Sequence, residues 1–153
     1  FEYIRLIKEF EPYVALMEQV TVFKKGNEIY DIFIKEALKL PYKIGERNIN
    51  SLHYRGKQDR DRILFCMIHE KWNSEPVFPD PDTTNVFRVK DFLPDVDYFL
   101  SGHYNDKIKT KNHFMCTVTS GSPIWLSKKG KKVPPTIDEL LLCMDVEKGQ
   151  YII

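Results

Sequence analysis

Two pairs of cysteine and histidine residues have side chains and a spacing that could bind a metal or activate a nucleophile. They are Cys66 with His69 and His113 with Cys116. Four such ligands would suit a tetrahedral zinc ion, and a thiol beside an imidazole can act as a nucleophile. Both pairs fall in apolar runs typical of strands, where residues three apart point to opposite faces. We therefore expect core packing and no bound metal, with a Cys/His hydrolase as an alternative function.

The most concentrated positive charge lies in a short loop around Gly130. Such a loop is often simply solvated, but lysines grouped in this way can also contact the phosphates of DNA or an acidic protein surface. A small barrel that binds nucleic acid or a nucleosome through this loop and stacking aromatic residues is another alternative function. The lysines of this expected contact patch are Lys128, Lys129, Lys131 and Lys132.

Composition limits the classes of protein to which the chain can belong. Its 153 residues suit one domain, and its formal net charge of +1 is far from that of a strongly basic nucleic-acid binder. Three widely spaced cysteines argue against a secreted disulfide framework and favour a reducing compartment. No apolar run approaches the ~20 residues of a membrane span. We expect no membrane contact, no cofactor and no small-molecule substrate.

Hydrophobic patterning predicts many short strands with one or two helices, a β-rich α+β fold. The first ten residues fit a short helix with a broad apolar face. Turn residues Gly26 and Asn27 lie between two β-prone runs and predict a hairpin over residues 19–34. A strand central to a sheet is expected at residues 63–72. Further strands are expected at residues 86–93 and 114–119 and in a final hairpin over residues 141–153.

Several of these segments, taken in order, resemble the bromo-adjacent homology (BAH) domain of chromatin proteins. The similarity covers roughly residues 20–153, and each piece alone is weak. It is carried by Ile44-Gly45-Glu46, by Phe65, Ile68 and Trp72, by Val86 to Asp95, by Tyr98 to Ser101 with Tyr104-Asn105-Asp106, by Phe114 to Val118, and by Leu141 to Ile153.

The resemblance implies a fold, a cellular setting and a function. The fold would be a distorted, partly open β-barrel over residues 20–153, preceded by a helical extension over residues 1–19. The function would be that of a non-enzymatic interaction module in a nuclear protein of silencing, replication or remodelling. Its partners would be other chromatin proteins, including a histone tail or a nucleosome, with weak DNA contact.

The resemblance departs from the family at the pocket that reads methylated lysine. Such a pocket needs aromatic faces, which attract a quaternary ammonium by cation–π contact. The aligned positions are Leu64, Asp91 and Leu93, none of which is aromatic, so we expect no working methyl-lysine cage. The residues expected to line the remaining ligand groove are Leu64, Trp72, Asp91, Leu93 and Tyr98.

Overall fold

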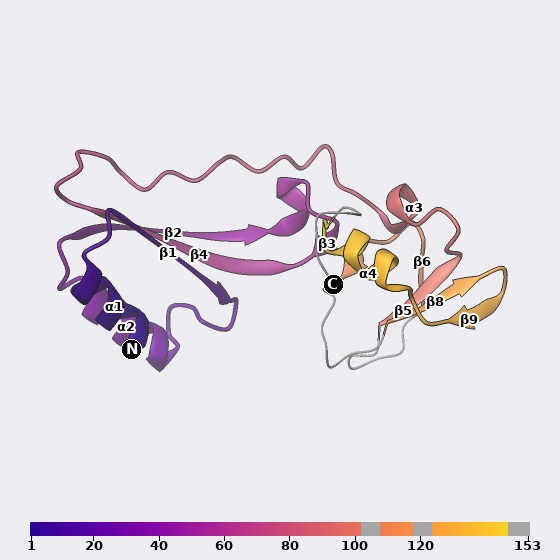
Figure 1. Cartoon of the computed structure of the whole chain (residues 1–153), viewed down its shortest axis with the longest axis horizontal. Helices are drawn as coiled ribbons and strands as arrows, with labels where there is room; N and C mark the ends of the chain where they lie inside the picture. The colour runs from indigo at the N-terminus through magenta and orange to yellow at the C-terminus, as the bar shows by residue number, and fades with distance from the viewer. Residues whose placement is uncertain (102–107, 118–123, 147–153) are drawn as a thin grey trace. The chain divides into compact units, whose positions relative to one another are not determined.

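The computed structural model describes residues 1–101, 108–117 and 124–146, which form a mixture of helices and strands (Figure 1). These residues fall into two compact units, and each is described by itself. The first unit contains residues 1–49 and 61–80, and the second contains residues 50–60 and 81–153. No helix in the described parts of the chain is long and apolar enough to cross a membrane.

A three-stranded sheet organises the first unit. Its strands are β1 (Val14–Val20), β4 (Asp61–His69) and β2 (Tyr42–Asn50), in that order across the sheet. Strands β1 and β4 are antiparallel and in unbroken register, from Val14 opposite Ile68 to Val20 opposite Arg62. The prediction of a central strand within residues 63–72 is confirmed, because β4 lies between the two other strands.

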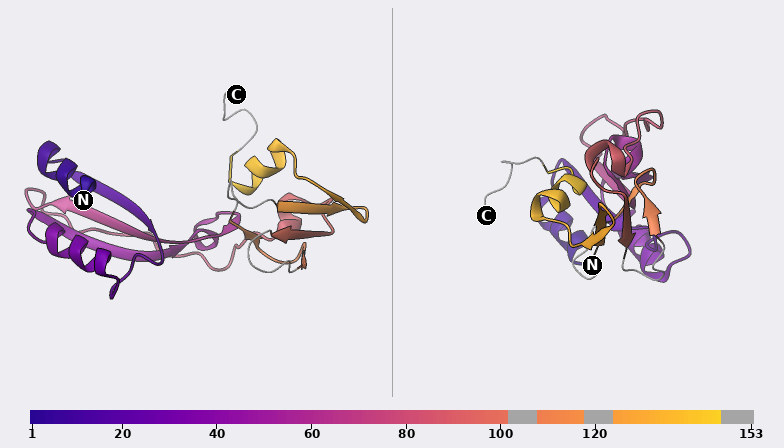
Figure 2. Two further views of the ribbon diagram at one scale, coloured as in Figure 1. Left: turned by 90° about the horizontal axis from the view of Figure 1, so that it is seen from below. Right: turned by 90° about the vertical axis from the view of Figure 1, so that its right-hand side faces the viewer.

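Helices α1 (Glu2–Phe10) and α2 (Glu28–Ala37) cover one face of this sheet (Figures 1 and 2). The predicted N-terminal helix is therefore confirmed. Phe33 of α2 meets Phe65 of β4 edge to face, with their ring centroids 5.3 Å apart. Apolar burial of this kind is the main force that holds helices on a sheet. The same core includes Ile4, Ile7, Ala15, Ala37, Tyr42, Ile63 and Met67.

The hairpin predicted over residues 19–34 is wrong, because α2 occupies most of its second half. The side chain of Asn27 accepts a hydrogen bond from the backbone N–H of Ile29, at 3.0 Å, and so caps the start of the helix. Asparagine is among the most favourable residues at this position. Phe33 and Ala37, four residues apart, then face the core together.

A four-stranded antiparallel sheet organises the second unit. Its strands, in spatial order, are β6 (Ile108–Thr110), β5 (Tyr98–Ser101), β8 (Ile124–Lys128) and β9 (Lys131–Val133). Their core contains Val89, Leu93, Val96, Phe99, Met115, Ile124, Leu126 and Cys143.

Shorter elements complete the second unit. A parallel pair joins β3 (Gln58–Asp59) to β7 (Met115–Cys116), which lies within the strand predicted at residues 114–119 but is shorter. Residues 118 and 119 lie outside the described residues. The remaining elements are a 3₁₀ turn, η1 (Ser51–Tyr54), and the helices α3 (Val89–Phe92) and α4 (Ile137–Cys143).

Two further strand predictions are wrong in the second unit. Residues 86–93 contain α3, because the carboxylate of Asp91 accepts a hydrogen bond from the Arg88 N–H, at 2.7 Å, and closes a helical turn. Residues 141–143 belong to α4, whose start is fixed by reciprocal hydrogen bonds between Thr136 and Glu139. Residues 147–153, the other half of the expected hairpin, lie outside the described residues.

The predicted β-barrel is also wrong, since the strands in the described parts of the chain form three separate sheets that do not close. The coarser expectation, a fold with both strands and helices, holds. Residues 1–19 were expected to be a helical extension, but only Glu2–Phe10 is helical and residues 14–19 belong to β1. The domain division at residue 19 stays a prediction.

Candidate functional site

The three-stranded sheet has a second face, away from the helices, that carries a different set of side chains. Along β1 every second residue is exposed, and along β4 the residues opposite them are buried or half-buried. Strand geometry places alternate side chains on opposite faces, so these residues share one face. We call it the outer face and define it by Val14, Leu16, Glu18, Val20, Arg62, Leu64 and Ile68.

An ion pair between Glu18 and Arg62 is the main polar feature of the outer face. The guanidinium Nε of Arg62 lies 2.8 Å from Glu18 Oε1 in an ion pair. The register places Val20 opposite Arg62, so Glu18 is its diagonal neighbour on the adjacent strand. The Arg62 side chain is 18% exposed and that of Glu18 is 52% exposed. The Arg62 side chain is therefore largely buried, whereas about half of the Glu18 side chain is accessible to solvent.

This pair offers hydrogen-bond acceptors and donors side by side. An ionised carboxylate only accepts, whereas a planar guanidinium only donates. Leu64 lies opposite Glu18 and two residues from Arg62, so an apolar side chain adjoins the pair. The arrangement suits a flat ligand that has amino and carbonyl groups along one edge. Sequence reasoning missed it because the two charged residues lie 44 positions apart and only the pairing of β1 with β4 brings them together.

The residues predicted to line a ligand groove are divided between the two units. Leu64 and Trp72 belong to the first, where Trp72 is half exposed and lies 4.9 Å from the ring of Tyr13. In the second, Leu93 is buried in the core, and Asp91 caps α3. Tyr98 is half-buried in β5, where it pairs with Thr110 and Ser127. The groove as a whole stays a prediction.

The cysteine and histidine pairs do not form a metal site or a nucleophilic dyad in the described residues. Burial raises the pKa of the Cys66 thiol. His69 is buried against the ring of Tyr42, and its Nδ1 accepts a hydrogen bond from Lys71 N–H. His113 Nδ1 instead lies 3.0 Å from the hydroxyl of Thr110. Within residues 1–101, 108–117 and 124–146, no three His, Cys, Asp or Glu side chains are grouped to hold a metal ion.

The four lysines of the predicted contact patch lie in a hairpin formed by β8, β9 and the turn between them, which we call the basic hairpin (residues 124–133). The turn is made by Lys129 and Gly130, both with positive φ. The ammonium of Lys128 pairs with Glu139 of α4, and Lys132 lies 4.7 Å from the ring centroid of Trp125. Lys129 and Lys131 are exposed beside the turn.

Acidic groups lie beside the turn of this hairpin. Burial alone would raise the pKa of Glu139, but hydrogen bonds from Lys128 and Thr136 outweigh it and leave the pKa below its usual value. The carboxylate of Asp97 accepts a hydrogen bond from Gly130 N–H at 3.3 Å. Lys128 is therefore neutralised, and the positive charge available to a ligand is concentrated on the exposed lysines.

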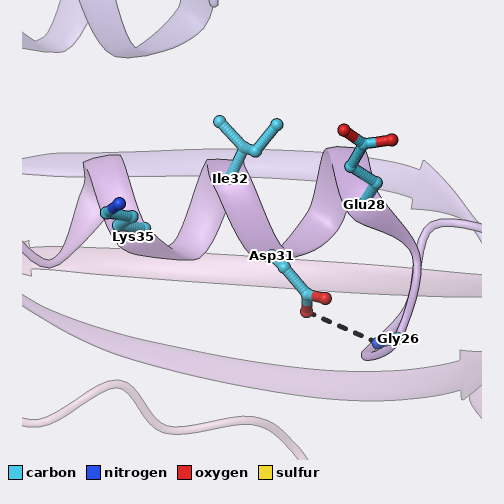
Figure 3. A pocket seen from close by; sticks show the side chains of 5 residues that line it. All are labelled: Gly26, Glu28, Asp31, Ile32 and Lys35. Carbon is cyan, nitrogen blue, oxygen red and sulfur yellow. Dashed lines mark hydrogen bonds between the residues drawn. The ribbon is translucent and has the colours of Figure 1, made fainter.

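Two shallow pockets lie elsewhere in the described residues. One, of about 380 Å³, adjoins the start of α2 and is lined by Gly26, Glu28, Asp31, Ile32 and Lys35 (Figure 3). Figure 3 shows Asp31 turned toward Gly26, whose N–H it accepts at 3.4 Å. The other, of about 340 Å³, is lined by residues 84–87 and Asp91. Nearby, hydrogen bonds from Thr84 and Asn85 hold the pKa of Asp82 well below its usual value.

Comparison with known proteins places the chain in an enzyme family. Residues 1–134 match the model of the C-5 cytosine-specific DNA methylase family, so the chain belongs to this family. A curated relative, the type II methyltransferase M.FnuDI of Fusobacterium nucleatum, is 31% identical over 115 residues. The match covers 72% of this chain and 33% of the relative, so the chain spans about a third of that protein's length.

These findings overturn the resemblance to a BAH domain and the interpretation as a non-enzymatic chromatin module. The matched family is one of enzymes that act on DNA. The chromatin partners, the histone tail and the nucleosome followed only from the resemblance and have no support. The nuclear location had the same basis and stays an untested prediction. The motifs misled because short apolar runs beside turn residues occur in many β-rich proteins.

Proposed function

We propose that this chain is part of an enzyme that methylates carbon 5 of cytosine in DNA, and that Glu18 and Arg62 hold the target base. The family description and the relative's printed name support the reaction. The observation that carries the role of the residues is the Glu18–Arg62 pair at 2.8 Å, with its carboxylate exposed on the outer face.

The polar edge of cytosine complements this pair. The base presents an N4 amino donor beside the N3 and O2 acceptors. A glutamate accepts from cytosine N4, and a guanidinium donates to ring or carbonyl acceptors. Held by this edge, the base keeps carbon 5 on the other side of the ring, free for methyl transfer. Leu64 would contact the face of the ring.

The proposal requires that the cytosine leave the double helix. In a duplex the polar edge is occupied by the pairing guanine, and DNA methyltransferases as a class extrude the base they modify. Extrusion costs a few kcal/mol of stacking and pairing, which contacts to the flipped base and to the backbone must offset. The Glu18–Arg62 pair supplies the first kind of contact.

The basic hairpin is the proposed source of backbone contacts. Lys129 and Lys131 are exposed, whereas Lys128 is neutralised by Glu139. Phosphate contacts by lysine position a protein on DNA without reading its sequence. Lys132, stacked near Trp125, would keep the hairpin rigid. DNA is thus the proposed partner of both features.

The test measures methyl incorporation into DNA by this chain co-expressed with the part of M.FnuDI that lies outside the matched 115 residues. Glu18→Gln and Arg62→Lys should each reduce the rate about a hundredfold or more, the usual effect of removing one aligned polar group from an active site. Glu2→Gln, an exposed change on α1, should leave it unchanged. Unaltered methylation by Glu18→Gln would refute the proposed role of the pair.

A further inference from the structure

We propose that one face of the four-stranded sheet in the second unit binds single-stranded nucleic acid by stacking its bases on Tyr98 and Trp125. This binding is a further activity of the chain. Its residues lie in the second unit, whereas Glu18 and Arg62, the pair proposed to hold the target base, lie in the first. The inference therefore does not rest on the proposed methyl transfer.

Strand register divides the side chains of this sheet between two faces. Phe99 lies opposite Leu126, which lies opposite Val133, and all three belong to the core of the second unit or pack against it. Helices α3 and α4 add Val89 and Cys143 to the same core, so both helices pack on this face. The alternate residues along each strand point to the other side of the sheet.

We call this other side of the sheet the open face. Its aromatic residues are Tyr98 on β5 and Trp125 on β8, both half-buried, and Ile108 on β6 is 63% exposed. One common class of RNA-binding domain uses a similar arrangement, a four-stranded sheet whose aromatic rings stack bases. The described members of the open face are Tyr98, Leu100, Ile108, Thr110, Trp125, Ser127 and Lys132.

The two aromatic rings are placed to receive neighbouring bases. Tyr98 lies opposite Ser127 and Trp125 lies opposite Leu100, so the two aromatic residues are diagonal neighbours on adjacent strands. Diagonal positions in an antiparallel pair lie roughly 7–8 Å apart. Successive bases of an extended strand can therefore each stack on one ring, and such stacking contributes to binding whatever the base. A duplex hides the faces of its bases in its own stack, so this surface favours a single strand.

The charge of the open face suits a phosphate backbone. The ammonium of Lys132 lies 4.7 Å from the ring centroid of Trp125, and none of the described members of this face is acidic. Lys129 and Lys131, which are exposed in the adjoining part of the basic hairpin, add positive charge. Proteins that bind single strands combine stacking rings with positive charge along the backbone in the same way.

Ser127 provides a second observation on the same face. It lies between Tyr98 and Lys132 in the register, and its side chain is fully buried. Its hydroxyl has no hydrogen-bond partner within the described parts of the chain. A buried hydroxyl without a partner is costly. A nucleotide stacked on Tyr98 would bring polar atoms within reach of this hydroxyl once the Lys132 side chain turns toward its phosphate.

The test measures binding of a fluorescein-labelled single strand of about 12 nucleotides to the whole 153-residue chain by fluorescence anisotropy. Trp125→Leu and Tyr98→Leu should each weaken binding about tenfold, because stacking of a base on the ring is lost. Trp125→Phe, which keeps an aromatic ring, should bind nearly as tightly as the wild type. Phe10→Leu is the matched control, since Phe10 is 70% exposed on α1 in the first unit.

Two further readouts distinguish stacking from a merely structural role of Trp125. The chain has two tryptophans, so Trp72→Phe leaves Trp125 as the reporter. A base stacked on Trp125 should quench its emission in proportion to the bound fraction that anisotropy measures. Lys132→Gln should lower the slope of log affinity against log salt by about 0.7, the effect of one phosphate contact on a single strand. Neither readout replaces Trp125, so both decide the matter even if Trp125→Leu does not fold.

Each outcome supports the proposal or overturns it. A DNA strand and an RNA strand of the same sequence are compared, and weaker binding of either by Trp125→Leu supports it, while the ratio of the two affinities identifies the preferred sugar. Equal affinities of Trp125→Leu and Phe10→Leu, or saturation without quenching of Trp125, would overturn the proposal. So would an unlabelled duplex that competes as strongly as the unlabelled single strand, since its bases are already stacked on one another.

Discussion

At the scale of single residues, strand pairing decides which side chains can act together. Glu18 and Arg62 are unremarkable charged residues in the sequence, and their pairing depends on the register of β1 against β4. Such long-range pairing is invisible to local patterns, which report only periodicity and turns. The cysteines were easier to interpret, because a thiol within an apolar run is usually buried.

Cys143 illustrates this point and gives a prediction about thiol chemistry. Burial, with the nearby Cys116 and Glu139 adding to it, raises the pKa of Cys143 to about 12 from a reference value of 9.0. The thiolate is the reactive form, so Cys143 should resist iodoacetamide at pH 8 in the folded protein and react readily in denaturant. Half-buried Cys116 should react faster in the folded state, as mass spectrometry of the labelled peptides would show.

The same raised pKa predicts how stability depends on pH. Above about pH 9 the Cys143 thiol ionises in the unfolded chain, while in the folded protein it keeps its proton until about pH 12. Its contribution is therefore complete below pH 9 and is lost as the pH rises, by up to about 1.4 kcal/mol of unfolding free energy per pH unit. Urea titrations should show a lower free energy of unfolding at pH 10 than at pH 8, and Cys143→Ala should reduce this loss. An equal loss of unfolding free energy between the two pH values in the variant and the wild type would contradict the raised pKa.

At the scale of elements, capping residues explain which predictions failed. The helix over the first ten residues and the central strand β4 were predicted correctly, since both have strong apolar patterns. The segments around Asn27 and Asp91 were read as strands from their β-prone residues, yet each side chain caps a helix. A capping hydrogen bond of this kind outweighs a modest strand preference, since intrinsic strand propensities differ by only about 1 kcal/mol between residue types.

The basic hairpin gives a prediction about DNA affinity. If Lys129 and Lys131 each contact one phosphate, replacing both with alanine should lower the slope of log affinity against log salt by about two. Affinity should fall by a similar factor for all DNA sequences, because phosphate contacts carry no sequence information. Both effects would be measured by fluorescence anisotropy at three salt concentrations. The protein would be this chain co-expressed with the part of M.FnuDI outside the matched residues.

The matched control is the double change Lys24→Ala and Lys25→Ala, which removes two exposed lysines from the first unit. It alters the net charge by the same amount. If both double variants lower the slope equally, the effect is one of overall charge, and the proposed role of the hairpin is wrong.

At the scale of the whole molecule, the sequence alone predicted a mixed fold but not the enzyme family. The chain spans about a third of its relative's length, and its proposed site is one ion pair on a sheet face rather than a contiguous motif. Without such a motif, the order of weak segments favoured a barrel of another family. Exposed Val14 and Leu16 could not have been distinguished from core residues by pattern, because β1 has apolar residues on both faces.

The most direct test of the central claim pairs a change in the protein with a change in the base. This chain, co-expressed with the part of M.FnuDI outside the matched residues, and its Glu18→Ala variant would be titrated with two duplexes that carry either cytosine or pyrimidin-2-one, which lacks the N4 amino group. The target base would lie opposite an abasic site in both duplexes, so that pairing with guanine does not contribute to the difference. If Glu18 accepts from N4, the wild type should bind cytosine more tightly than the analogue by about 1–3 kcal/mol, the scale of a specific base contact. The variant should bind both equally. A preference of the same size in Glu18→Ala would contradict the account.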